Sequence, residues 1–120
     1  MLFLRNTFCL LTVGPPGVSI TGNQQTDAPD VLTLTCTTTG RVNPAPTLTW
    51  RNSTDGAVLS GTSPVRVGSS QDGGYVYRST LSITTQWYQD GDTIVCEGRN
   101  PGIQSQQTVT DSKQLDINCK

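Results

Sequence analysis

Apolar and polar residues alternate along most of this chain in short runs. In the longest run, 75–83, every second residue would share one face, and that face would carry Tyr77, Ser79, Leu81 and Ile83. A period of two is that of a β-strand, because successive side chains of a strand point to opposite faces. The same alternation predicts strands at 18–21, 31–37, 47–50, 65–67, 75–83, 93–96 and 109–117, with a short strand within 55–61.

Turn-forming residues separate these runs. Gly, Pro, Asn and Asp are concentrated at 22–23, 43–46, 71–74 and 90–92. No run of useful length has a helical period, and no segment of the chain is repeated. Short strands at regular spacing, separated by turn signals, predict an all-β sandwich of one domain.

Three residues on predicted strands make this interpretation more specific. Cys36 lies in 31–37, Trp50 follows it in 47–50, and Cys96 ends 93–96. Over residues 15–118 the chain thereby resembles the immunoglobulin superfamily. The resemblance implies an immunoglobulin-like Greek-key sandwich of two antiparallel sheets. It also implies a disulfide between Cys36 and Cys96, with the Trp50 ring packed against it in the core.

Shorter motifs point to a constant-like domain between the C2 and C1 sets. Residues 80–83 followed by Trp87 resemble constant-type (C1-set) domains. Residues 96–100 and the stretch 43–46 before Trp50 resemble C2-set adhesion receptors of the nephrin-like and nectin-like kinds. Ile94 stands where variable domains carry a corner tyrosine, which argues against a variable domain.

The first residues differ in composition from the rest. Residues 1–14 are either a signal peptide or the remnant of a preceding domain, and 15–120 form the immunoglobulin-like domain. Apolar residues make up only 33% of the chain, so a lean core would benefit from a covalent link.

Composition also narrows the function classes. The formal net charge is −1 and no basic run is present, so nothing favours nucleic acid as a partner. The chain lacks histidine, which removes Ser-His-Asp and Cys-His catalysis and the commonest metal ligand. We therefore expect no enzymatic activity and no cofactor or metal. Four cysteines in a polar chain fit an extracellular location, secreted or in the ectodomain of a membrane protein.

Cys9 and Cys119 leave two alternatives open. They either bond each other, or Cys119 forms a disulfide with a partner chain or domain, particularly if a signal peptide takes Cys9 away.

A sequon and two short clusters carry further expectations. Asn52-Ser53-Thr54 predicts a glycan on Asn52, in a turn where an acceptor must be exposed. The carboxylates of Asp90 and Asp92 supply too few oxygen ligands for a calcium ion. We therefore expect these two aspartates to cap a turn. Trp87 and Tyr88 either form an exposed aromatic platform or, as the constant-domain resemblance implies, Trp87 packs against the adjoining turn.

A candidate partner site lies in the loop after Cys96. Arg99, Asn100 and Ile103 combine a cationic fork with an apolar anchor, and Arg51 and Asp55 should lie beside them on the same sheet. The leading hypothesis is a protein-binding module of a cell-surface adhesion molecule or receptor, with another immunoglobulin-like domain as partner. The alternative is a structural spacer of an immune-type receptor or secreted immunoglobulin-like protein.

Overall fold

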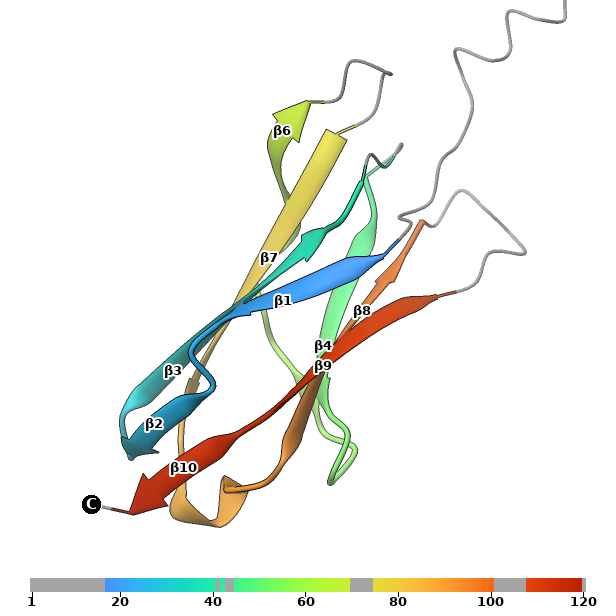
Figure 1. Ribbon diagram of the computed structural model, residues 1–120. Coiled ribbons are helices and arrows are strands. Elements are labelled where there is room, and N and C mark those ends of the chain that lie inside the picture. The colour runs from blue at the N-terminus through green and yellow to red at the C-terminus, as the bar shows by residue number, and fades with distance from the viewer. Residues whose placement is uncertain (1–16, 41, 43–44, 70–74, 101–107, 120) are drawn as a thin grey trace, which may run out of the picture.

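The computed structural model describes residues 17–40, 42, 45–69, 75–100 and 108–119 (Figure 1). In this part the chain forms β-strands and one short 3-10 helix. Their order is β1 (Val18–Gly22), β2 (Gln25–Ala28), β3 (Val31–Thr38), β4 (Thr47–Asn52), β5 (Val58–Leu59), β6 (Val65–Ser69), β7 (Tyr75–Thr84), η2 (Trp87–Gln89), β8 (Thr93–Arg99), β9 (Val109–Gln114) and β10 (Asp116–Cys119).

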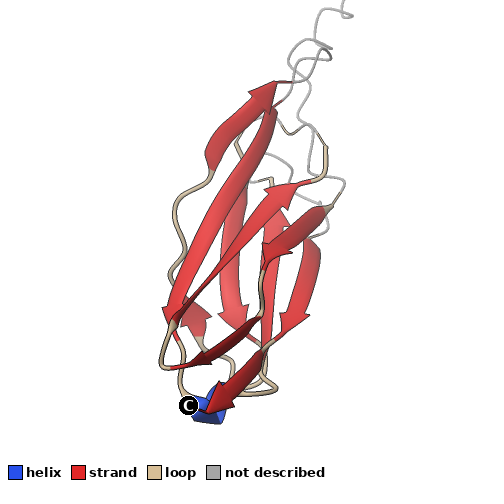
Figure 2. Cartoon of the chain, turned by 60° about the vertical axis from the view of Figure 1, so that its left-hand side comes forward, coloured by secondary structure: helices blue, strands red, loops and turns tan. Residues whose placement is uncertain are grey.

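Two antiparallel sheets face each other. One sheet has the strand order β1-β3-β7-β6 and the other β5-β4-β8-β9, and β10 pairs with β2 in a short parallel ribbon (Figures 1 and 2). Strands distant in sequence are neighbours in each sheet, as in a Greek key. The structure therefore confirms the predicted immunoglobulin-like sandwich.

Hydrophobic alternation explains which side of each strand is buried. Along β3, exposed or half-buried residues alternate with buried ones, and the buried set includes Leu32, Leu34 and Cys36. Leu48 and Trp50 of β4 and Ile94 and Cys96 of β8 face them. The side chains of both sheets thus meet in one core.

The centre of that core is closed by a disulfide. Cys36 of β3 is bonded to Cys96 of β8, and neither side chain is exposed, which confirms the expected pair. Trp50 is 1% exposed, and its indole Nε1–H donates to the Ser79 Oγ at 3.0 Å. The Ser79 hydroxyl donates in turn to the Thr62 carbonyl at 2.6 Å. The polar atom of the buried ring is therefore satisfied, as burial requires.

The C-terminal strand differs from its prediction. The segment expected as one strand at 109–117 is divided at Leu115, which is 2% exposed. The Leu115 N–H donates to the Asp92 carbonyl at 2.7 Å, and its own carbonyl accepts from the Gly91 N–H at 3.0 Å. Beyond this point the chain changes partner from β8 to β2. The strand β2 escaped prediction because Gln25–Ala28 has no apolar alternation.

The two ends of the sandwich are referred to below as poles. The N-terminal pole is the end at which β1 begins and β8 ends (Figure 1). The C-terminal pole is the end at which β10 ends beside η2 (Figure 2). Cys119 is the last residue of β10, whereas Cys9 and the expected boundary after residue 14 lie outside the described residues. The pairing of these two cysteines stays a prediction.

Candidate protein-binding face

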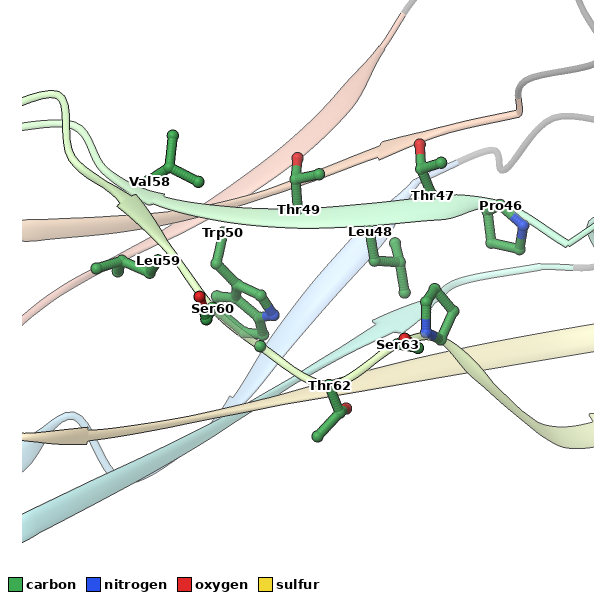
Figure 3. A pocket seen from close by; sticks show the side chains of 12 residues that line it. Pro46, Thr47, Leu48, Thr49, Trp50, Val58, Leu59, Ser60, Thr62 and Ser63 are labelled. Atoms are coloured by element: carbon green, nitrogen blue, oxygen red, sulfur yellow. The ribbon is translucent and has the colours of Figure 1, made fainter.

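The second sheet presents one side to the core and the other to solvent. Because paired residues of neighbouring strands share a face, Arg51 lies beside Val95 and Val58, and Thr49 lies beside Glu97. Figure 3 shows Thr47, Thr49 and Val58 on the side opposite to Leu48 and Trp50. We call this side the outer face, and define it by Thr47, Thr49, Arg51, Val58, Val95, Glu97, Arg99, Thr110 and Ser112. Val95 is the buried member of this set, with 7% of its surface exposed.

An ion pair lies in the middle of the outer face. The Arg51 guanidinium donates to a Glu97 carboxylate oxygen at 2.6 Å, with side chains 41% and 29% exposed. A pair this open to solvent adds about 0–1 kcal/mol to stability. The pair places a positive and a negative group side by side on the outer face.

The threonines of β4 are turned toward β8. The hydroxyl of Thr47 donates to the Arg99 carbonyl at 3.3 Å, and that of Thr49 approaches the Glu97 carbonyl at 3.5 Å. Val58 is 82% exposed at the edge of the same face. The outer face therefore combines threonine side chains, one exposed valine and a charged pair.

The expected site at the end of β8 is only partly formed. Arg99 is exposed at the N-terminal pole, as a partner contact requires. Asn100 was expected to contact a partner, but its exposed fraction is zero, so this assignment is wrong. Ile103 lies outside the described residues.

The structure also separates Arg51 and Asp55 from Arg99. Arg51 is level with Val95, four residues and about 13 Å along β8 from Arg99. Asp55 lies beyond the other end of β4, at the C-terminal pole, where its Oδ1 accepts the Ala57 N–H at 2.8 Å. Arg51 and Asp55 therefore do not lie beside Arg99 as expected, because β4 runs antiparallel to β8 and leads away from the N-terminal pole, where β8 ends.

Asn52 is a further correction. The sequence indicated an exposed turn, yet Asn52 is the last residue of β4 and 3% exposed. Its Nδ2 donates to the Asp92 Oδ2 at 2.8 Å. The strand extends two residues further than predicted, which places Asn52 on the same face as the buried Ile94.

Trp87 differs from its prediction in the opposite sense to Asn52, because it is more exposed than expected. Trp87 was expected to pack on the adjoining turn, but Trp87 and Tyr88 are 67% and 64% exposed. Their rings meet edge to face with centroids 5.8 Å apart. The pair lies on η2 and forms an exposed aromatic surface at the C-terminal pole, close to the end of β10 (Figure 2).

A groove of about 380 Å³ lies between β4 and the segment 60–64. Figure 3 shows Leu48 and Trp50 pointing from β4 toward that segment. No charged residue lines the groove, which is bordered by Pro46, Thr47, Leu48, Thr49, Trp50, Val58, Leu59, Ser60, Gly61, Thr62, Ser63 and Pro64. Its polar groups are therefore hydroxyl and backbone groups, and none of its side chains could pair with a charged ligand.

The described residues form neither a metal-binding cluster nor a membrane-spanning helix. Among them, no three histidine, cysteine, aspartate or glutamate side chains are grouped so as to hold a metal ion. Asp90 Oδ1 accepts the Ile117 N–H at 2.9 Å, so both Asp90 and Asp92 have roles in the turn. Within the same ranges, no helix is long and apolar enough to span a membrane.

Sequence reasoning missed most of the outer face. Thr49, Val58 and Glu97 were not singled out, although the alternation in 47–50 already assigns Thr49 to the solvent side. Polar residues on the exposed side of a strand are common, so no pattern distinguishes a binding face from ordinary solvated surface.

Solved structures include similar folds. The chain is 23% identical to the full ectodomain (Ig1–Ig3) of mouse nectin-like molecule 4, with a TM-score of 0.72 over 90% of this chain and 35% of that chain. It is 17% identical to the D1–D2 part of Rst, with a TM-score of 0.68 over 91% of this chain and 51% of that chain. At these identities the likeness shows the fold. The chain spans about a third to a half of the two solved chains.

Curated proteins give no match. The profile of the CD80-like C2-set immunoglobulin domains matches residues 9–114, which is most of the chain. The Cys36–Cys96 disulfide and the buried Trp50 lie inside the matched range. The chain therefore belongs to the CD80-like C2-set immunoglobulin domain family.

Proposed function

We propose that this domain is an extracellular protein-binding module of a cell-surface adhesion molecule or receptor, and that its outer face contacts another immunoglobulin-like domain. The observation that carries the proposal is the outer face itself, where Val58 is 82% exposed beside the Arg51–Glu97 ion pair. Family membership and the nectin-like ectodomain neighbour support an extracellular location.

The surface chemistry suits a protein partner. Interfaces of this kind combine an apolar contact with a polar, partly hydrated rim. Val58 and the threonine methyl groups supply apolar area, and Arg51, Glu97 and Arg99 supply charged groups that set the orientation of the partner. The proposed activity is binding rather than catalysis.

The test is a matched pair of variants measured against a panel of purified immunoglobulin-like ectodomains, with a second copy of this chain included. The variant Thr49→Arg with Val58→Glu adds large groups to the outer face, each beside an opposite charge on Glu97 or Arg51. We expect at least tenfold weaker biosensor affinity for the domain that binds.

The control, Ser82→Arg with Thr84→Glu, changes two exposed positions of β7 on the other sheet and should leave affinity unchanged. Equal affinity of wild type and the outer-face variant would move the interface elsewhere. Absence of binding to every panel member would favour the spacer.

One observation supports the spacer as the second candidate. The exposed pair Trp87 and Tyr88 lies next to the end of β10, where a domain that followed in the same chain would be attached. Both solved neighbours contain more than one domain. Cys119 ends β10 at this pole, and we expect it to bond a partner chain or domain if residues 1–14 are removed.

A further inference from the structure

The three residues of the only sequon are part of one hydrogen-bonded turn. Asn52 ends β4, and Ser53 and Thr54 begin the connection to β5. Asn52 is 3% exposed, and its strand partner Ile94 is 1% exposed. Paired residues share a face, so the Asn52 side chain points into the sandwich and away from solvent.

Both ends of the Asn52 amide are used. Its Nδ2 donates to the Asp92 carboxylate at 2.8 Å, and its Oδ1 accepts the Thr54 N–H at 2.9 Å. The backbone of Asn52 is equally engaged, because its N–H donates to the Ala57 carbonyl and its carbonyl accepts the Gly56 N–H, both at 2.8 Å. The side chain therefore connects the β4–β5 turn to the connection that precedes β8.

The other two residues reinforce this connection. The Ser53 N–H donates to the Thr93 carbonyl at 2.9 Å, and the Ser53 hydroxyl approaches the same oxygen at 3.3 Å. The Thr54 Oγ1 accepts the Thr93 N–H at 3.1 Å. The groups that define a glycosylation signal, the asparagine amide and the threonine hydroxyl, are thus both engaged in hydrogen bonds of the fold, the amide in the interior and the hydroxyl at the surface.

Attachment of a sugar would need the same amide nitrogen. Transfer from a lipid-linked diphosphate oligosaccharide would form a bond between the sugar C1 and Nδ2, break the bond between C1 and the diphosphate oxygen, and release one Nδ2 proton. Because Asn52 is only 3% exposed, a sugar bonded to its Nδ2 would have to displace the residues packed around it.

We propose that glycosylation of Asn52 and the native fold of the C-terminal pole exclude each other. The folded domain carries an unmodified Asn52, whose amide is a structural link to Asp92.

The first experiment measures the modification directly. The chain is expressed in a eukaryotic secretory host, and the intact masses of the secreted and retained fractions are compared before and after treatment with peptide N-glycosidase. We expect the secreted protein to lack the sugar at Asn52, and any modified chain to appear only in the retained fraction. A secreted, modified protein with the melting temperature of the unmodified one would overturn the proposal.

The second experiment separates a structural role of the amide from the loss of the sequon. Asn52→Asp replaces the donor with a carboxylate that faces the Asp92 carboxylate, so the melting temperature should fall by more than about 10 °C. In Asn52→Asp with Asp92→Asn, donor and acceptor are exchanged, and the introduced carboxylate can still accept the Thr54 N–H.

The double variant should recover most of that loss. Both variants lack the sequon, so an absent sugar cannot explain a difference between them. Equal melting temperatures of the two variants, whether both low or both native, would contradict the structural link.

Discussion

The centre of the sandwich and its C-terminal pole are held together in different ways. At the centre, the Cys36–Cys96 disulfide joins the sheets and Trp50 fills the apolar space around it. At the pole, the connection between strands depends on hydrogen bonds, such as those that Asp92 accepts from Asn52 and Asp90 from Ile117. Apolar contacts need only the right volume and position, whereas each polar contact needs a matched donor and acceptor. The contacts at the centre can therefore be predicted from residue type, whereas those at the C-terminal pole can be identified only from the tertiary structure.

The two tryptophans show the same contrast within one residue type. Trp50 is 1% exposed and its indole N–H is bonded to Ser79, whereas Trp87 is 67% exposed beside Tyr88. Trp50 lies on the inward side of a central strand, and Trp87 lies on a short helix outside both sheets. A large aromatic residue is thus structural in one region and available for contact in the other.

The largest expected effect is at the centre. Cys36→Ala should lower the free energy of unfolding by roughly 2–5 kcal/mol, or prevent folding, because it removes a cross-link that closes a loop of 60 residues. The measurement is chemical denaturation of wild type and variant. Thiol titration of denatured, unreduced wild type should find Cys36 and Cys96 blocked, and two free thiols at these positions would refute the disulfide.

A second substitution tests how tightly the centre is packed. A Cβ atom added at Gly61 would clash with the Trp50 Cδ1 and lie 3.1 Å from the Ser79 Oγ. Because the Trp50 ring is buried, we expect Gly61→Ala to cost about 1–3 kcal/mol of unfolding free energy in a denaturation curve. The control is Gly68→Ala, where nothing lies within 4 Å of the added atom. Similar stabilities of the two variants would show that the ring can move aside.

The smallest expected effect is at the pole. Trp87→Phe should change the free energy of unfolding by no more than about 0.5 kcal/mol, because the side chain is largely in solvent. The same substitution at Trp50 removes the hydrogen bond to Ser79 and should cost about 1–3 kcal/mol. A loss at Trp87 comparable to that at Trp50 would show that η2 supports the fold rather than only presenting an exposed surface.

The sequence predicted the fold well and the candidate site poorly, for physical reasons that individual residues show. Strands such as 75–83 were found because burial on one side imposes a two-residue period. Asn52, Asn100 and Asp55 were misplaced because polar residues carry no such period. Asn52 and Asn100 are buried, and the burial of Asn52 depends on a hydrogen-bond partner, Asp92, that is distant in sequence.

The sequence by itself determined the scaffold. The alternation of apolar residues predicted the strands, because burial on one side imposes a period of two, and the resemblance of Cys36, Trp50 and Cys96 to the immunoglobulin pattern implied a disulfide-closed sandwich. Only the tertiary structure decided which polar groups are used inside the fold and which remain at the surface. It buried the Asn52 amide against Asp92, left Trp87 and Tyr88 in solvent, and separated Arg51 from Arg99. Hydrogen bonds require donor and acceptor to meet at a fixed distance and angle, and that condition is set by how the two sheets and their connections pack.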